Sequence, residues 1–118
     1  MTLTVDLESI LTNLVNELGP SVYFILISSL NGVIMKSYIN ENEFNKASIS
    51  LNISQLYELA EETAEDIGLH SPDFNIIHSD NYYLLTIKVL EHLVLLLTTD
   101  QVEVKDVFRI INQSVNPA

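Results

Sequence analysis

The chain has 118 residues, a net charge of −11 and no cysteine. Its length fits a single domain over residues 1–118, large enough to bury roughly two-thirds of its unfolded surface. The lack of cysteine excludes disulfides and thiolate metal sites.

The five cations of the chain are scattered along the sequence, so nucleic acids and anionic membranes are poor candidate partners. No apolar run approaches the ~20 residues of a membrane-spanning helix. The acidic N-terminus does not resemble a signal peptide, which predicts a cytoplasmic protein.

An amphipathic helix is expected over residues 6–18. Asp6 is placed to cap its start, and Gly19 with Pro20 ends it. Its apolar stripe, at the spacing of one helical face, consists of Leu7, Ile10, Leu11, Leu14, Val15 and Leu18.

A β-hairpin is expected next, in the sequence VYFILISSLNGVIMKSYI from Val22 to Ile39. Its two apolar runs are joined by Asn31 and Gly32, a dipeptide that favours the positive φ angles of a two-residue type I′ turn. The first run does not alternate between apolar and polar residues, which is typical of a strand covered on both faces.

The longest helix is expected over residues 42–67, with Gly68 placed to end it. One apolar stripe is predicted to face the sheet, and it consists of Ile49, Ile53, Leu56, Ala60, Ala64 and Ile67. The opposite side is divided. Its first half is apolar, with Phe44, Ala47 and Leu51, and its second half is acidic, with Glu58, Glu61, Glu62 and Glu65.

Three strands are then expected in DFNIIHS, YYLLTIKV and HLVLLLT, with turns at Asp80-Asn81 and Leu90-Glu91. DFNIIHS is the most polar strand, which suits an edge of the sheet. The last helix has the pattern of a capping box, with Asp100 as cap and Glu103 three residues later. Its buried side is predicted to hold Val104, Val107, Phe108, Ile111 and Val115.

The expected fold class is therefore α+β, with the order α-β-β-α-β-β-β-α. This order, with ISSLNGVIMKSYI and the acidic loop NENE before the long helix, resembles the Roadblock (dynein light-chain) family and its MglB-type members. The resemblance covers about residues 7–115. It implies a Roadblock/profilin-like five-stranded antiparallel sheet, with the long helix on one face and the terminal helices on the other. It also implies dimers formed through an edge strand and the long helix, and a role as a scaffold or regulator of small Ras-like GTPases.

The apolar residues on the outer side of the long helix have two interpretations. Phe44 can precede the helix and fold into the loop, which leaves Leu51 as one ordinary exposed leucine. Alternatively, this side, with Leu59 beside it, meets the partner helix of a dimer or a GTPase. Hiding two large side chains contributes roughly 3–5 kcal/mol before the costs of association. We favour the second interpretation.

The acidic residues can serve solubility alone, or they can face an electropositive partner that relieves the like-charge pair of Glu58 and Glu62. A two-fold dimer can also pair the DFNIIHS strand with its copy. The predicted partner or dimer interface consists of Phe44, Ala47, Leu51, Gln55, Glu58, Leu59, Glu62, Ile76 and His78.

Catalytic chemistry is not expected. His70, His78 and His92 have no metal-ligand spacing, and the three glycines form no phosphate loop, so neither a metal nor another cofactor is predicted. The single arginine, Arg109, is placed to pair with Asp106 on the last helix rather than to act as an arginine finger.

The sequence therefore predicts a non-enzymatic, dimeric binding module that docks or regulates a small Ras-like GTPase, with itself or a Roadblock relative as the dimer partner. The alternative is a structural subunit of a heteromeric motor, trafficking or motility scaffold that does not regulate a GTPase directly.

Overall fold

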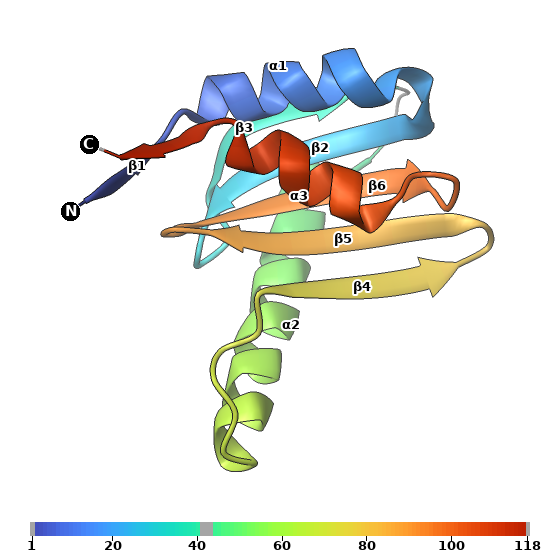
Figure 1. Cartoon of the computed structure of the whole chain (residues 1–118). Helices are drawn as coiled ribbons and strands as arrows, with labels where there is room; N and C mark the ends of the chain where they lie inside the picture. Colours follow the sequence, from blue (N-terminus) through green and yellow to red (C-terminus); the bar gives the residue numbers. More distant parts are fainter. Residues whose placement is uncertain (1, 41–43, 118) are drawn as a thin grey trace.

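The computed structural model describes residues 2–40 and 44–117. A five-stranded antiparallel sheet lies between α2 on one face and α1 with α3 on the other (Figure 1). The elements in chain order are β1 (Leu3–Val5), α1 (Leu7–Leu18), a short 3-10 turn η1 (Gly19–Ser21), β2 (Val22–Ser29), β3 (Ile34–Ile39), α2 (Lys46–Asp66), β4 (Phe74–Ser79), β5 (Tyr82–Val89), β6 (His92–Thr99), α3 (Val104–Asn112) and β7 (Val115–Pro117). The predicted α+β class and layer arrangement are confirmed.

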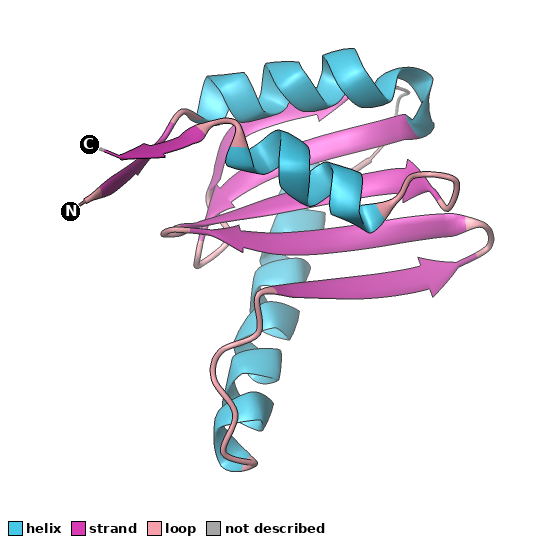
Figure 2. Cartoon of the chain, in the orientation of Figure 1, coloured by secondary structure: helices cyan, strands magenta, loops and turns pink. Residues whose placement is uncertain are grey.

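The strands of the sheet lie in the order β3-β2-β6-β5-β4 (Figure 2). All neighbouring strands are antiparallel, and β3 and β4 form the two edges. The predicted edge position of the DFNIIHS strand is therefore confirmed. β2 and β6 are central and buried along most of their length, because helices cover both of their faces.

The β2–β3 hairpin is confirmed, but its predicted two-residue turn is wrong. The Ser29 N–H donates to the Val33 carbonyl at 2.9 Å, which encloses a loop of three residues. Within this loop only Gly32 has a positive φ, of 91°, as in loops that combine a turn with a glycine bulge. A two-residue turn with two positive φ angles occurs instead at Asp80 (51°) and Asn81 (68°).

The ends of the chain form a small sheet that the sequence analysis missed. β1 and β7 pair in antiparallel fashion, with Leu3 opposite Pro117. Val115, predicted on the last helix, lies in β7, because α3 already ends at Asn112. Strands of three residues are too short for a pattern of period two to reveal them.

The two predicted caps of the outer helices have different outcomes. Asp6 does cap α1, since its carboxylate accepts a bond from the Ser9 N–H at 3.1 Å. Asp100 does not cap α3, which has Glu103 at its N-cap position and no side-chain cap bond. The Asp100 carboxylate, in the turn after β6, instead lies 3.1 Å from His78 Nε2 on β4, so a contact with a distant strand replaces the local cap.

The long helix α2 begins later than predicted. Residues 42 and 43 lie outside the described residues, and Phe44 and Asn45 precede the helix. The Asn45 side chain accepts a bond from the Ser48 N–H at 3.1 Å, which makes Asn45 the N-cap. Phe44 is therefore not a helical residue. Its ring packs edge-on against Phe24 of β2 at 5.1 Å between centroids, in agreement with the alternative in which Phe44 folds into the loop.

The buried side of α2 also differs from the predicted stripe. Its buried residues are Ser50, Ile53, Ser54 and Tyr57, whereas Leu56 and Ile67 are 40% and 68% exposed. Figure 1 shows the reason: α2 crosses the sheet at a steep angle, and its second half extends beyond β4. Among residues 2–40 and 44–117, no strand lies under that half of the helix.

Candidate interaction surface

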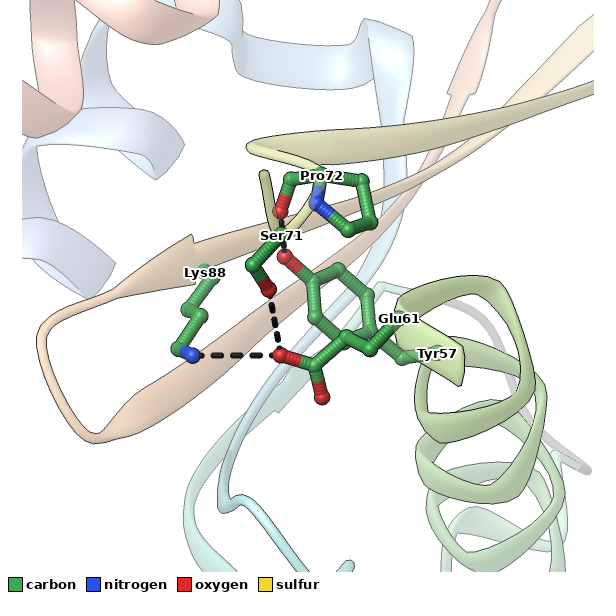
Figure 3. Close-up of polar contacts among 5 residues, drawn as sticks. All are labelled: Tyr57, Glu61, Ser71, Pro72 and Lys88. Atoms are coloured by element: carbon green, nitrogen blue, oxygen red, sulfur yellow. Dashed lines mark hydrogen bonds and ion pairs between the residues drawn. The ribbon is translucent and has the colours of Figure 1, made fainter. Parts of the chain in front are cut away.

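A polar cluster fixes the direction of α2 where the helix leaves the sheet (Figure 3). The hydroxyl of the buried Tyr57 donates to the carbonyl of Pro72, just before β4. One turn later the Glu61 carboxylate accepts a bond from the Ser71 hydroxyl at 2.5 Å and lies 3.3 Å from the Lys88 ammonium on β5. These contacts hold the middle of α2 against the end of the sheet, so the rest of the helix, to Asp66, projects beyond it.

The pKa values of Glu61 and Tyr57 favour the protonation states that these hydrogen bonds need. The Ser71 hydroxyl lowers the pKa of Glu61 below its usual value. Burial opposes this effect, and the Lys88 ammonium adds to the lowering. Burial raises the pKa of Tyr57 to about 12, assisted by the negative charges of Glu61 and Asp73. Glu61 is thus held as a carboxylate and Tyr57 as a neutral donor. The prediction that Glu61 lies on the outer side of the helix with the other glutamates is wrong, because its carboxylate contacts Ser71 and Lys88.

The projecting half of α2 has an apolar flank. A hollow of about 400 Å³ on this flank is lined by Leu56, Leu59, Ala60, Thr63, Ala64, Ile67 and Leu69. All four of its large apolar side chains are exposed: Leu56, Leu59, Ile67 and Leu69. Contiguous apolar surface of this kind is typical of a site that a partner covers.

The sheet beside α2 continues this apolar character. Ile77 of β4 pairs with Leu84 of β5, and Leu84 packs with the cluster under α2, so Ile77 lies on the α2 side of the sheet. Ile77 is exposed, and in the described part of the chain β4 has only β5 as a neighbour. We name the α2–β4 surface by its exposed apolar residues, Leu56, Leu59, Ile67, Leu69 and Ile77.

The predicted interface residues fall into separate places. Gln55, Glu58, Leu59 and Glu62 line one hollow of about 330 Å³ on the outer side of α2. Leu51 is exposed one turn earlier, and Ala47 is exposed near the start of the helix. Phe44 is half-buried under the chain's own fold.

Ile76 and His78 lie on the other face of β4, because they pair with Leu85 and Tyr83 of the α1/α3 side. Only Leu59 belongs to both the predicted set and the α2–β4 surface. Leu56, Ile67, Leu69 and Ile77 were missed as surface residues. The first two have the spacing of a sheet-facing stripe, and the sequence does not show where the sheet ends.

Among residues 2–40 and 44–117, no three His, Asp or Glu side chains come together to hold a metal ion. In the same part of the chain, every helix is too short or too polar to cross a membrane. Arg109 lies on the α1/α3 side, 3.3 Å from Glu17 and 3.8 Å from Asp106, so the predicted pair with Asp106 is present.

No protein-family model and no curated protein matches the chain. Solved structures do match its fold. MglB of Myxococcus xanthus gives a TM-score of 0.78 at 12% identity, over 92% of this chain and 90% of that chain. A Roadblock/LC7 domain from Streptomyces avermitilis gives a TM-score of 0.77 at 14% identity, over 92% and 90% of the two chains. A structure described as MglB with tetrameric arrangement gives 0.75 at 10% identity, over 89% and 79%. The chain therefore has the fold of the MglB and Roadblock/LC7 proteins, as predicted.

Proposed function

We propose that this protein is a non-enzymatic, cytoplasmic homodimer that docks or regulates a small Ras-like GTPase. The observation that carries the proposal is the α2–β4 surface. It combines an open sheet edge with a helix whose apolar flank extends beyond that edge. A small Ras-like GTPase is the partner that the resemblance to the Roadblock family implies, and the fold shared with MglB and Roadblock/LC7 proteins supports it.

The geometry favours a second copy of this chain as the cover of the α2–β4 surface. If β4 pairs with its copy about a two-fold axis, the two sheets become continuous. The projecting half of each α2 then lies over the partner's sheet. The four large apolar side chains of the flank, two on α2 and two just after it, are each about half exposed. They contribute roughly 3–6 kcal/mol per protomer on burial, before the costs of association. The tetrameric arrangement of one solved MglB is consistent with self-association through this fold.

Such a dimer leaves the outer side of α2 free for another protein. This side carries Leu51, Gln55, Glu58 and Glu62. Glu58 and Glu62 are a like-charge pair one turn apart, and a basic partner surface relieves their repulsion and speeds encounter. Arg109 is held by two carboxylates on the far face of the sheet. Any stimulation of GTP hydrolysis then acts by positioning the GTPase's own residues.

The dimer is tested by sedimentation of the purified chain and of Leu59→Glu. The wild-type protein is expected to be a dimer, and Leu59→Glu a folded monomer, because the new carboxylate lies in the centre of the buried flank. Val33→Glu is the matched control, since Val33 is equally exposed but lies on the hairpin far from β4. A monomeric wild-type chain, or loss of the dimer in both variants, contradicts the proposed interface.

The partner is tested by passing native cytoplasmic extract over the immobilised protein. Retention of a small GTPase in its GTP-loaded form, reduced by a joint Glu58→Lys and Glu62→Lys change, is the expected result. A chain that aggregates alone but becomes soluble when a Roadblock relative is co-expressed favours the heteromeric scaffold instead.

A further inference from the structure

The backbone of β4 presents alternate residues to the open edge of the sheet. The Lys88 N–H of β5 donates to the Asp73 carbonyl at 3.2 Å, so Asp73, just before β4, turns its backbone groups toward β5. In an antiparallel ladder the N–H and C=O of one residue point to the same side, and this side alternates along the strand. Phe74, Ile76 and His78 therefore turn their N–H and C=O groups outward, to the side where the described part of the chain has no strand.

β4 carries none of the usual protections of an edge strand. Proteins commonly protect an edge with charged side chains, prolines or bulges. From Phe74 to Ser79, β4 contains no proline and no Lys, Arg, Asp or Glu. Its pairing with β5 runs over the same residues without a bulge. The outer side of β4 is therefore a regular template for another strand.

The outward-facing residues also have exposed side chains on the α1/α3 side of the sheet. Phe74 and Ile76 are 40% and 41% exposed, and His78 is exposed as well. The Phe74 ring packs edge-on against Phe108 of α3 at 5.0 Å between centroids, and both rings line a hollow of about 390 Å³. Exposed apolar surface at this edge thus continues on the face away from α2.

Two-fold symmetry limits the ways in which β4 can pair with its copy. An axis perpendicular to the sheet joins the two strands in antiparallel fashion and keeps both α2 helices on one face. The ladder then bonds outward-facing residues of one strand to outward-facing residues of the other. Because these residues alternate along β4, the axis must pass beside one residue and not between two. Axes near the middle of the strand pair the most residues.

Of the axes near the middle, only the one at Ile76 uses every outward-facing residue. An axis one residue earlier places His78 opposite the partner's Pro72, which has no N–H to donate. An axis one residue later places Phe74 opposite the partner's Asp80, whose φ of 51° belongs to the turn and not to an extended strand. With the axis at Ile76, Phe74 lies opposite the partner's His78, and all bonded pairs stay within the strand.

We propose that two copies of this chain join through β4 with Ile76 on the two-fold axis. The inference rests on the proposed dimer and adds its register and the residues that meet. On the α1/α3 face the two Ile76 side chains lie opposite each other, and the partner's His78 lies opposite Phe74 at the rim of the hollow. On the α2 face Ile77 lies opposite the partner's Asn75. A single interface thus covers apolar residues on both faces of β4.

Single cysteines report this register directly, because the chain has no cysteine of its own. Ile76→Cys is expected to form a disulfide-linked dimer in most molecules when oxidised glutathione takes up the two thiol hydrogens. Opposite residues of a hydrogen-bonded pair have Cα atoms about 5.5 Å apart, within the span of a disulfide.

Ile77→Cys is the matched control, since Ile77 is the next residue and is 43% exposed. In the proposed register its two copies are diagonal neighbours, about 7–8 Å apart, which a disulfide does not span without backbone movement. Little covalent dimer is therefore expected. Sedimentation of each variant under reducing conditions shows whether the non-covalent dimer is intact.

Hydrogen exchange measured by NMR tests the same alternation without a cysteine. In the wild-type dimer the amides of Phe74, Ile76 and His78 are expected to exchange at least about tenfold more slowly than in the Leu59→Glu monomer. The amides of Ile77 and Ser79 already bond to β5 and are expected to change much less.

Sedimentation separates failure of the dimer from failure of its register. A dimer in which Ile77→Cys is linked better than Ile76→Cys moves the axis to Ile77, and the inference is overturned while the proposed dimer stands. A dimer with neither link and no added protection of β4 overturns both the register and the β4 interface. A monomeric wild-type chain contradicts the proposed homodimer itself.

Discussion

The two faces of the sheet are built by the same strands but are closed by different helices. Among the described residues, fourteen buried apolar side chains form the core under α1 and α3, and only six form the core under α2. The strands are apolar on both faces, so the difference comes from the helices. α1 and α3 lie over the sheet, while α2 crosses it and continues beyond β4 (Figure 1). The α1/α3 face thus has the larger buried core, and the α2 face leaves the residues of the α2–β4 surface exposed.

A core substitution on the α1/α3 face tests whether that face is self-sufficient. Ile110→Ala removes a fully buried side chain of α3 and is expected to lower the free energy of unfolding by about 2–5 kcal/mol. Denaturant titrations at two protein concentrations measure the loss, which should be the same at both. A loss that depends on concentration would show that this face also takes part in association.

Gly32→Ala tests the packing of the hairpin against α2. Its added Cβ would lie 2.9 Å from the Ser54 hydroxyl oxygen, at a residue whose φ is +91°. The expected loss of stability is about 1–3 kcal/mol, measured by thermal unfolding. Gly68→Ala is the matched control, since Gly68 also has a positive φ but its Cβ would meet no atom within 4 Å. Equal losses at both glycines would assign the effect to φ alone.

Glu61→Gln gives the smallest effect and tests the cluster that directs α2. Because the pKa of Glu61 is lowered in the folded state, its contribution to stability is present above its unfolded pKa and is lost as pH falls through the folded value. The carboxylate is partly exposed, so the contribution is a few tenths of a kcal/mol. Wild type and variant should therefore differ in stability at pH 7, and the difference should shrink as pH falls from about 4.3, the ordinary value for Glu, through the lowered folded pKa. A difference that persists at low pH would point to packing instead.

The sequence was sufficient for features that depend on local patterns. The stripe of α1 and its Asp6 cap, the β2–β3 hairpin and the edge position of β4 are all present. Features that depend on distant contacts were missed. Asp100 had the spacing of a cap, but His78 on β4 binds it instead. Glu61 had the spacing of an acidic row, but Ser71 and Lys88 turn it inward.

By itself, the sequence determined the order of the helices and of the strands in the five-stranded sheet, and the layered α+β class. Hydrophobic period and turn residues act over a few neighbouring positions, which is why these features were readable. The sequence also determined that α2 carries more apolar residues than one face can hide. Only the tertiary structure decided which of them stay exposed. That choice depends on the crossing angle of α2, and contacts between residues far apart in the chain set this angle. Gly32 packs against Ser54, and Tyr57 binds the Pro72 carbonyl.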